Sequence, residues 1–150
     1  MPTITPFLWF DTQAEEAMNF YMSIFKDAKV IAVSRANGKV LSVQFELQGQ
    51  RFYGLNGGPH FKFNEAISFF VGVETQQEID ELWDKLIAEG GAPSRCGWLK
   101  DRFGLSWQVI PNALGRMLSD PDPAKSQRAM QAMLQMNKLD LAALQKAYEG

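Results

Sequence analysis

The sequence has 150 residues, of which 46% are hydrophobic and 21% charged, which is typical of a soluble globular protein with enough chain for one domain. Its 15 Lys and Arg residues are scattered among 17 Asp and Glu residues, for a formal net charge of −2, so we expect no nucleic-acid partner. A single cysteine, Cys96, excludes an internal disulfide framework, and no signal peptide or membrane span is apparent. We therefore expect a cytoplasmic protein without a membrane partner.

The first part of the sequence predicts a strand, a helix and three more strands. Thr3–Phe10 is rich in β-branched and aromatic residues, and Thr12-Gln-Ala-Glu15 has the spacing of a capping box that opens a helix. Asn37-Gly38 is a dipeptide favoured in tight hairpins, and Gly57-Gly58-Pro59 breaks the chain. The three strands expected after the helix are Lys29–Arg35, Val40–Gln48 and Arg51–Asn56.

The same order of elements then begins again. Ile67–Val73 predicts a strand, Thr75-Gln-Gln-Glu78 is a second capping box, and Gly90-Gly91 ends the helix that follows. The repeated T-Q-x-E after an aromatic strand predicts two related modules. Fewer residues follow the second helix, which leaves room for two strands. The predicted fold class is therefore α+β, with paired βαβββ modules, the second one shortened, forming a curved mixed sheet.

A helical tail completes the chain. Ala113–Ser119 predicts a short helix, Asp122-Pro123 opens a second one over Ala124–Met136, and Asp140 caps a last one. Such helices are marginal alone, so the tail should pack on the sheet, on a partner subunit, or on both. We expect one domain over residues 1–150, with module one at about 1–58, module two at about 66–111 and the tail at 113–150.

The stretch KDRFGLSWQVIP, Lys100–Pro111, predicts a polar turn followed by a strand that a proline closes. Asp101 and Arg102 in the turn are expected to form a solvated pair. Alternate residues of the strand form a hydrophobic wall, and Gln108 points the other way. A polar group in the middle of a sheet needs a hydrogen-bond partner. Whether the amide of Gln108 faces a ligand or another side chain is therefore the main question about the function of this protein.

Three strings carry a family resemblance: LNGGPHFKFNEAISFFV (Leu55–Val71), CGWLKDRFGLSWQVIP (Cys96–Pro111) and SDPDPAKSQRAMQAMLQMNKLDLAALQKAYEG (Ser119–Gly150). They resemble the PhnB-like family, catalogued in places as the 3-demethylubiquinone-9 3-methyltransferase domain. That family belongs to the vicinal oxygen chelate superfamily, alongside glyoxalase I, bleomycin-resistance proteins and extradiol dioxygenases. The resemblance implies a homodimer of paired βαβββ modules, with strands or domains exchanged between subunits in some members.

The resemblance also locates the places where metal-using members of the superfamily carry four His or Glu ligands. In this sequence these places fall on Thr5, Asn56, Ser68 and Gln108. All four are neutral, whereas a divalent ion prefers imidazole, thiolate or carboxylate ligands. We therefore expect no metal and no other cofactor. Glu46, on the polar face of its strand, is the one acid that could restore such a site.

A ligand pocket is the remaining candidate site. Phe7, Trp9 and Phe70 share strand parity with Thr5 and Ser68, so they should face the concave side of the sheet. An apolar surface with a few polar groups is typical of a small-molecule site, although a filled barrel core or a swapped dimer interface gives the same pattern. The candidate ligand-binding residues are Thr5, Phe7, Trp9, Asn56, Ser68, Phe70, Trp98 and Gln108.

The sequence thus predicts a metal-independent, small-molecule-binding protein of the vicinal oxygen chelate fold that pairs with itself as a homodimer; whether it catalyses a reaction stays open. Two alternatives are a metal-dependent lyase or dioxygenase of the same superfamily and an interaction protein whose tail, Asp122–Gly150, mediates assembly. A methyltransferase is disfavoured, because Asn56-Gly57-Gly58-Pro59 lacks the spacing and the following helix of a methyl-donor loop. Cys96 and His60 predict no nucleophilic pair.

Overall fold

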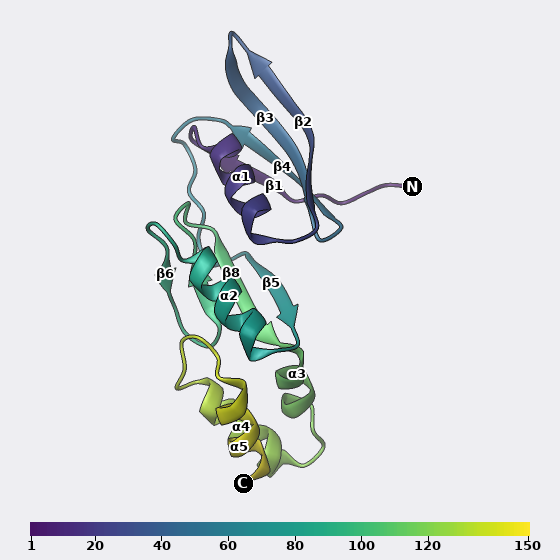
Figure 1. Cartoon of the computed structure of the whole chain (residues 1–150), viewed down its shortest axis with the longest axis vertical. Coiled ribbons are helices and arrows are strands. Elements are labelled where there is room, and N and C mark those ends of the chain that lie inside the picture. The colour runs from purple at the N-terminus through teal and green to yellow at the C-terminus, as the bar shows by residue number, and fades with distance from the viewer. The chain divides into compact units, whose positions relative to one another are not determined.

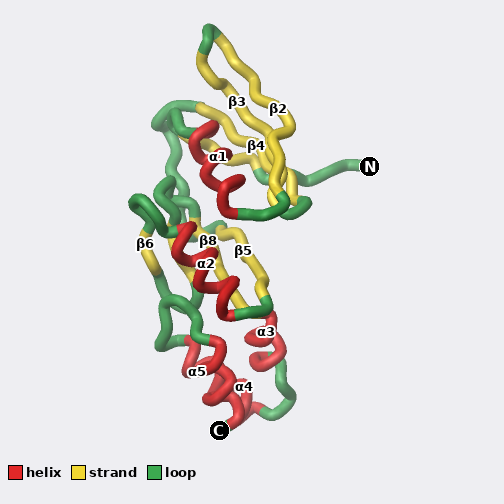
Figure 2. Tube along the Cα trace, viewed as in Figure 1, coloured by secondary structure: helices red, strands yellow, loops and turns green.

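The computed structural model describes residues 1–150 and divides them into two compact units, Met1–Lys62 and Phe63–Gly150. Each unit contains one four-stranded mixed sheet and a helix that covers one face of it (Figure 1). Helices gather again at the end of the chain, in the second unit (Figure 2). This is the predicted α+β fold. None of the helices has the length and apolar character needed to span a bilayer.

The first unit has the predicted βαβββ order. Its strand order is β1-β4-β3-β2, with β1 parallel to β4 and the other pairs antiparallel. Asn37 and Gly38 have φ values of 54° and 77°, as a type I′ turn requires, so the predicted hairpin is confirmed. Its elements are β1 (Phe7–Phe10), α1 (Ala14–Ile24), β2 (Ala28–Ala36), β3 (Lys39–Leu47) and β4 (Gln50–Asn56).

Helix α1 packs on one face of this sheet, and its start differs from the prediction. The capping box predicted at Thr12 is wrong, because Gln13 occupies the N-cap position and makes no side-chain capping hydrogen bond. Instead, Asn56 Oδ1 accepts the N–H of Ala14 at 2.8 Å. The cap therefore comes from the end of β4 rather than from the residues next to the helix.

The second unit repeats the pattern with strand order β5-β8-β7-β6, and β5 is parallel to β8. The capping box at Thr75 and Glu78 is confirmed in both of its hydrogen bonds. Three strands follow α2 instead of the predicted two, since the two-residue β6 is too short to show any alternation in sequence. The elements are β5 (Ser68–Val73), α2 (Gln76–Leu86), β6 (Ala92–Pro93), β7 (Trp98–Lys100), β8 (Ser106–Pro111), α3 (Asn112–Leu118), α4 (Pro123–Met133) and α5 (Leu141–Glu149).

Two cores hold the second unit together. On one face of the sheet, Trp107 and Val109 of β8 are buried beneath α2. At the end of the sheet, Ile110 opens a second cluster that the tail completes with Leu114, Met117, Ala129, Leu139 and Leu144. The tail thus packs on its own sheet, which is one of the arrangements expected, and α4 ends three residues earlier than predicted.

Backbone and amide hydrogen bonds fix the tail against the sheet. Met136 and Asn137 accept the N–H groups of Cys96 and Gly97, each at 2.8 Å. The side chain of Gln76 in α2 donates to the carbonyl oxygen of Leu139 at 3.0 Å and accepts the N–H of Leu141 at 2.7 Å. These bonds make the tail an integral part of the second unit.

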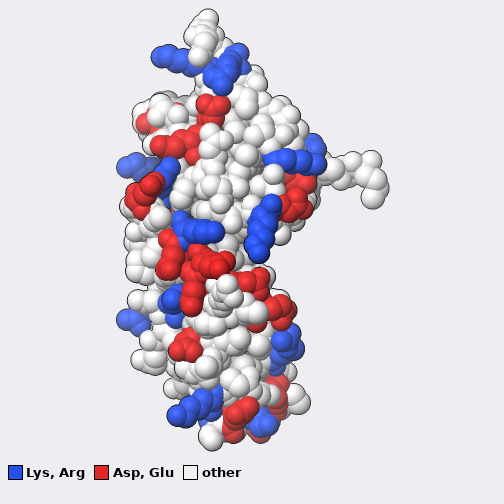
Figure 3. All heavy atoms as spheres, in the orientation of Figure 1, with Lys and Arg blue, Asp and Glu red and all other residues white.

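Charges are mixed over the surface. On the face drawn in Figure 3, Lys and Arg side chains are dispersed among Asp and Glu and form no continuous basic stripe.

Candidate functional site

The open face of the second sheet brings four of the predicted residues together. Phe70 on β5 and Trp98 on β7 both lie opposite Gln108 on the central strand β8. Residues opposite one another on neighbouring strands share a face. Since the flanking Trp107 and Val109 are buried beneath α2, Gln108 and its two aromatic neighbours lie on the face that α2 does not cover.

Gln108 has a definite polar partner on that face. Its Nε2 donates to Oγ of Ser68 at 2.9 Å. The bond leaves the hydroxyl proton of Ser68 and the carbonyl oxygen of Gln108 available for other partners. Phe70 beside it is 62% exposed and Trp98 is half-buried. The arrangement is a polar pair between two aromatic side chains, which suits a largely apolar molecule with one polar group.

The turn before β8 is built around a buried carboxylate. Asp101 is only 2% exposed, so the prediction that it is solvated is wrong, and Arg102 forms an ion pair with Glu89. Asp101 Oδ1 accepts the N–H groups of Phe103 and Leu105 at 2.9 and 3.1 Å. Its Oδ2 accepts Nε1–H of Trp107 at 2.9 Å. These bonds fix the start of β8 and therefore the direction in which Gln108 points.

The first unit holds the other predicted aromatic residues. Phe7, 59% exposed, lies opposite Tyr53 and stacks on it with ring centroids 5.6 Å apart. Trp9, on the same face of β1, donates its indole N–H to the carbonyl oxygen of Gly58 at 2.9 Å. Phe61 meets the Trp9 ring edge-on at 4.9 Å. Phe7 and Trp9 thus belong to one aromatic surface of this unit.

The other two residues predicted for the first unit take different positions. Thr5 lies half-buried, two residues before β1 begins. Asn56 lies on the α1 side of the sheet, because its Oδ1 caps Ala14 and its Nδ2 donates to the carbonyl oxygen of Val40 at 3.1 Å. Phe7 and Trp9 are on the opposite face, so Asn56 does not join them.

The four residues expected at the metal-ligand places, Thr5, Asn56, Ser68 and Gln108, do not fit a divalent ion. All are uncharged, and the oxygen of Asn56 and Oγ of Ser68 already accept hydrogen bonds within the chain. Glu46, the acid considered as a substitute, pairs with Lys29 at 3.9 Å. The structure gathers no group of three or more His, Cys, Asp or Glu side chains that could hold a metal ion.

The glycine loop after β4 does not fit a methyl-donor site. Such a site needs free backbone N–H groups at the start of a helix. Here the N–H groups of Gly57 and Gly58 donate to the carbonyl oxygens of Phe10 and Asp11 at 2.9 and 3.3 Å. A Cβ atom on Gly57 would lie 2.3 Å from the ring of Trp9. The loop is a turn closed tightly over Trp9.

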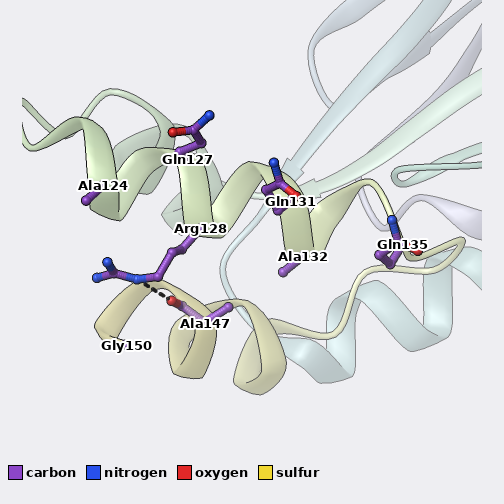
Figure 4. A pocket seen from close by; sticks show the side chains of 8 residues that line it. All are labelled: Ala124, Gln127, Arg128, Gln131, Ala132, Gln135, Ala147 and Gly150. Carbon is purple, nitrogen blue, oxygen red and sulfur yellow. Dashed lines mark hydrogen bonds between the residues drawn. The ribbon is translucent and has the colours of Figure 1, made fainter.

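The tail contains a groove that the sequence did not indicate. It lies between α4 and α5 and has a volume of about 950 Å³. Figure 4 shows Gln127 and Gln131 one turn apart on α4 and Gln135 just beyond its end, while Arg128 reaches across to the carbonyl oxygen of Ala147 at the end of α5. No predicted site residue lines this groove. Its walls depend on how two helices pack against each other, which the sequence does not indicate.

Known proteins match most of this chain. The family described as 3-demethylubiquinone-9 3-methyltransferase matches residues 2–110, so the tail string Ser119–Gly150, expected to share the resemblance, lies outside the match. The PhnB protein from Bacillus cereus is 36% identical, with a TM-score of 0.68 over 73% of this chain and 99% of that chain. No curated protein matches.

More distant solved structures show the fold alone. Protein PA1353 from Pseudomonas aeruginosa has a TM-score of 0.62 at 20% identity, over 74% of this chain and 98% of that chain. The fosfomycin resistance protein FosX from Listeria monocytogenes, complexed with Mn(II) and sulfate ion, has a TM-score of 0.55 at 14% identity, over 73% and 89%. These likenesses show the vicinal oxygen chelate architecture.

Proposed function

The chain belongs to the 3-demethylubiquinone-9 3-methyltransferase (PhnB-like) family of the vicinal oxygen chelate superfamily, and we propose that it binds a small, largely apolar molecule without a metal ion. The observation that carries this proposal is the hydrogen-bonded pair of Ser68 and Gln108 on the open face of the second sheet. Phe70 and Trp98 flank Gln108 on both neighbouring strands. The aromatic rings offer apolar contact, and the pair offers a proton donor and an acceptor that orient the ligand.

The first unit has an apolar surface of its own, which we propose as a second candidate ligand surface. Phe7 and Trp9 share one face of β1, and Thr5 lies two residues before that strand. Asn56 is left out of the proposed ligand site, because both ends of its amide serve the fold. Its role is to start α1.

Metal independence is supported by the lack of charge on the candidate ligand groups, which are Thr5 and Asn56 in the first unit and Ser68 and Gln108 in the second. A metal-dependent lyase or dioxygenase is the competing function, since relatives of this fold include FosX, solved with Mn(II). Metal analysis of dialysed protein separates the two. Stoichiometric bound Zn, Ni, Mn or Fe would refute the metal-independent proposal.

The test of the ligand site is Gln108→Leu, compared with Gln77→Leu on the exposed side of α2 as a matched control. A thermal-shift screen first finds molecules that raise the unfolding midpoint of the natural protein. We expect Gln108→Leu to bind such a molecule about tenfold more weakly, since the orienting hydrogen bond is lost, and Gln77→Leu to bind it unchanged. If Gln108→Leu unfolds the protein and no molecule shifts the midpoint, the amide is structural and the proposal fails.

We further propose that the protein is a cytoplasmic homodimer, whose two subunits can either exchange strands or domains or pair without exchange. Support comes from exposed apolar side chains on the open sheet faces, Phe7 and Phe70, and a second candidate surface is the exposed pair of Met130 on α4 and Leu134 at its C-cap. The mass in solution tests the dimer, and the double variant Met130→Lys with Leu134→Lys decides between the surfaces. An unchanged dimer in that variant excludes α4 as the interface, whereas a monomer supports assembly through the tail.

A further inference from the structure

One hydroxyl group in the second unit is buried without a hydrogen-bond partner. Ser106 is 1% exposed, and its Oγ neither donates nor accepts a hydrogen bond within the chain. An unpartnered buried polar group is unfavourable for stability, and few are found in native proteins. The group therefore needs an explanation beyond the fold.

Ser106 belongs to the same open face as the proposed ligand site. It lies two residues before Gln108 on the central strand β8, so the two side chains point the same way. Its neighbours in register are Ser68 on β5 and Lys100 on β7. The distance along the strand from Ser106 to Gln108 is about 7 Å, which is the length of a small aromatic acid.

An ion pair links the segments on the two sides of the strand that carries this hydroxyl. Lys100 is on one side of β8, and its ammonium group pairs with Glu65, which leads into β5 on the other side. The pair therefore spans β8 from Lys100, which lies opposite Ser106. The hydrogen bond from Lys100 lowers the pKa of Glu65. The two side chains are 43% and 61% exposed, and exposed ion pairs of this kind are weak, so this one opens at little cost.

We propose that the ligand is a monocarboxylate with an apolar or aromatic body, and that Glu65 takes the place of its carboxylate in the free protein. When the ligand binds, its carboxylate displaces Glu65 and accepts hydrogen bonds from the ammonium group of Lys100 and the hydroxyl of Ser106. Its apolar body lies over Gln108 between Phe70 and Trp98. This inference rests on the proposed function and adds the chemical class of the ligand.

The experiment compares benzoate with benzamide, a neutral molecule of nearly the same shape, by ligand-observed NMR titration of the full chain. Benzoate should bind about tenfold more tightly than benzamide, because a charge-assisted hydrogen bond is stronger than a neutral one. Glu65→Gln removes the internal competitor and should tighten benzoate binding several-fold while leaving benzamide unchanged. Lys100→Met should abolish the preference for benzoate. Asp84→Asn, at an exposed acid of α2, is the matched control for Glu65→Gln and should change neither affinity.

Ser106→Ala gives a result that a structural role would not. The substitution removes a hydroxyl that has no partner, so the unfolding midpoint should stay the same or rise while benzoate binding weakens. A lower midpoint would show that the hydroxyl serves the fold, and would overturn its assignment to the ligand.

The outcomes also separate this inference from the proposed function. If both probes bind equally, Lys100→Met changes neither, and Gln108→Leu weakens both, the carboxylate assignment fails and the apolar site stands. If Glu65→Gln, in which nothing competes for Lys100, binds no benzoate at millimolar concentration, the inference is overturned. The proposed function is then decided by the thermal-shift screen alone.

Discussion

Replacing Asp101 with Asn should destabilise the protein by about 2–5 kcal/mol, because an amide cannot satisfy the three donors that the carboxylate serves. In one orientation the new amide oxygen faces the backbone N–H groups of Phe103 and Leu105, and the NH2 group then faces Nε1–H of Trp107. In the other orientation the NH2 group opposes the two backbone donors. Either way, buried donors meet without an acceptor, and each such group costs about 1–3 kcal/mol.

A double-mutant cycle with Trp107→Phe isolates the contact to the indole. Trp107→Phe is destabilising alone, because it leaves a cavity and removes a buried hydrogen bond. In the double variant, however, the NH2 group of the amide that replaces the Asp101 carboxylate no longer opposes an indole N–H. We therefore expect the double variant to lose about 1–2 kcal/mol less free energy of unfolding than the two single variants lose together.

Urea unfolding followed by far-ultraviolet circular dichroism measures these free energies without relying on tryptophan fluorescence. If Asp101→Asn unfolds within about 0.5 kcal/mol of the natural protein, the carboxylate does not hold the turn. Strictly additive single and double variants would show that Asp101 and Trp107 do not interact in solution.

Other contacts make smaller, separate predictions. Gln76→Ala should cost about 1–3 kcal/mol and speed amide hydrogen exchange in the tail, whereas Gln77→Ala on the exposed side of α2 should stay within about 0.5 kcal/mol. Gly57→Ala should cost about 1–3 kcal/mol and change the near-ultraviolet circular dichroism, because the new methyl group would displace the indole beside it. The hydrogen bond from Tyr148 lowers the pKa of Asp120 and raises that of Tyr148 itself. The stability this bond provides, measured as the difference from Tyr148→Phe, should therefore be constant between about pH 5 and 9; it should be lost as the pH falls through the lowered pKa or rises through the raised one.

Features of the fold that depend on neighbouring residues could be predicted from the sequence. The capping box at Thr75 and Glu78 and the turn at Asn37-Gly38 each place all of their determinants within four residues. The cap of α1 could not be predicted, because Asn56 supplies it from 42 residues away along the chain. Nor could β6, whose two residues carry no periodic pattern.

The candidate site likewise has features that the local sequence predicts and features that depend on the strand order. Alternation along a strand is local, so the sequence correctly placed Gln108 on the face opposite the buried wall. That Ser68 is its hydrogen-bond partner requires β5 to lie beside β8, which follows from the parallel pairing in the structure. The ion pair of Glu65 with Lys100 has no sequence signal, since it depends on the same strand order. Asp101 was misjudged, because a carboxylate in a turn is buried only where donors converge on it.

The two faces around β8 differ in how completely their polar groups are satisfied, and this difference favours the open face as the functional one. In the turn before the strand, Asp101 is buried and accepts three hydrogen bonds. On the open face, Ser106 is equally buried and has none. The fold thus provides hydrogen-bond partners for the buried carboxyl group of Asp101 but none for the buried hydroxyl of Ser106. Buried polar groups without a partner are rare in native proteins, and they are expected at functional sites. The stability of Ser106→Ala relative to the natural protein is therefore the measurement on which the interpretation of this face depends.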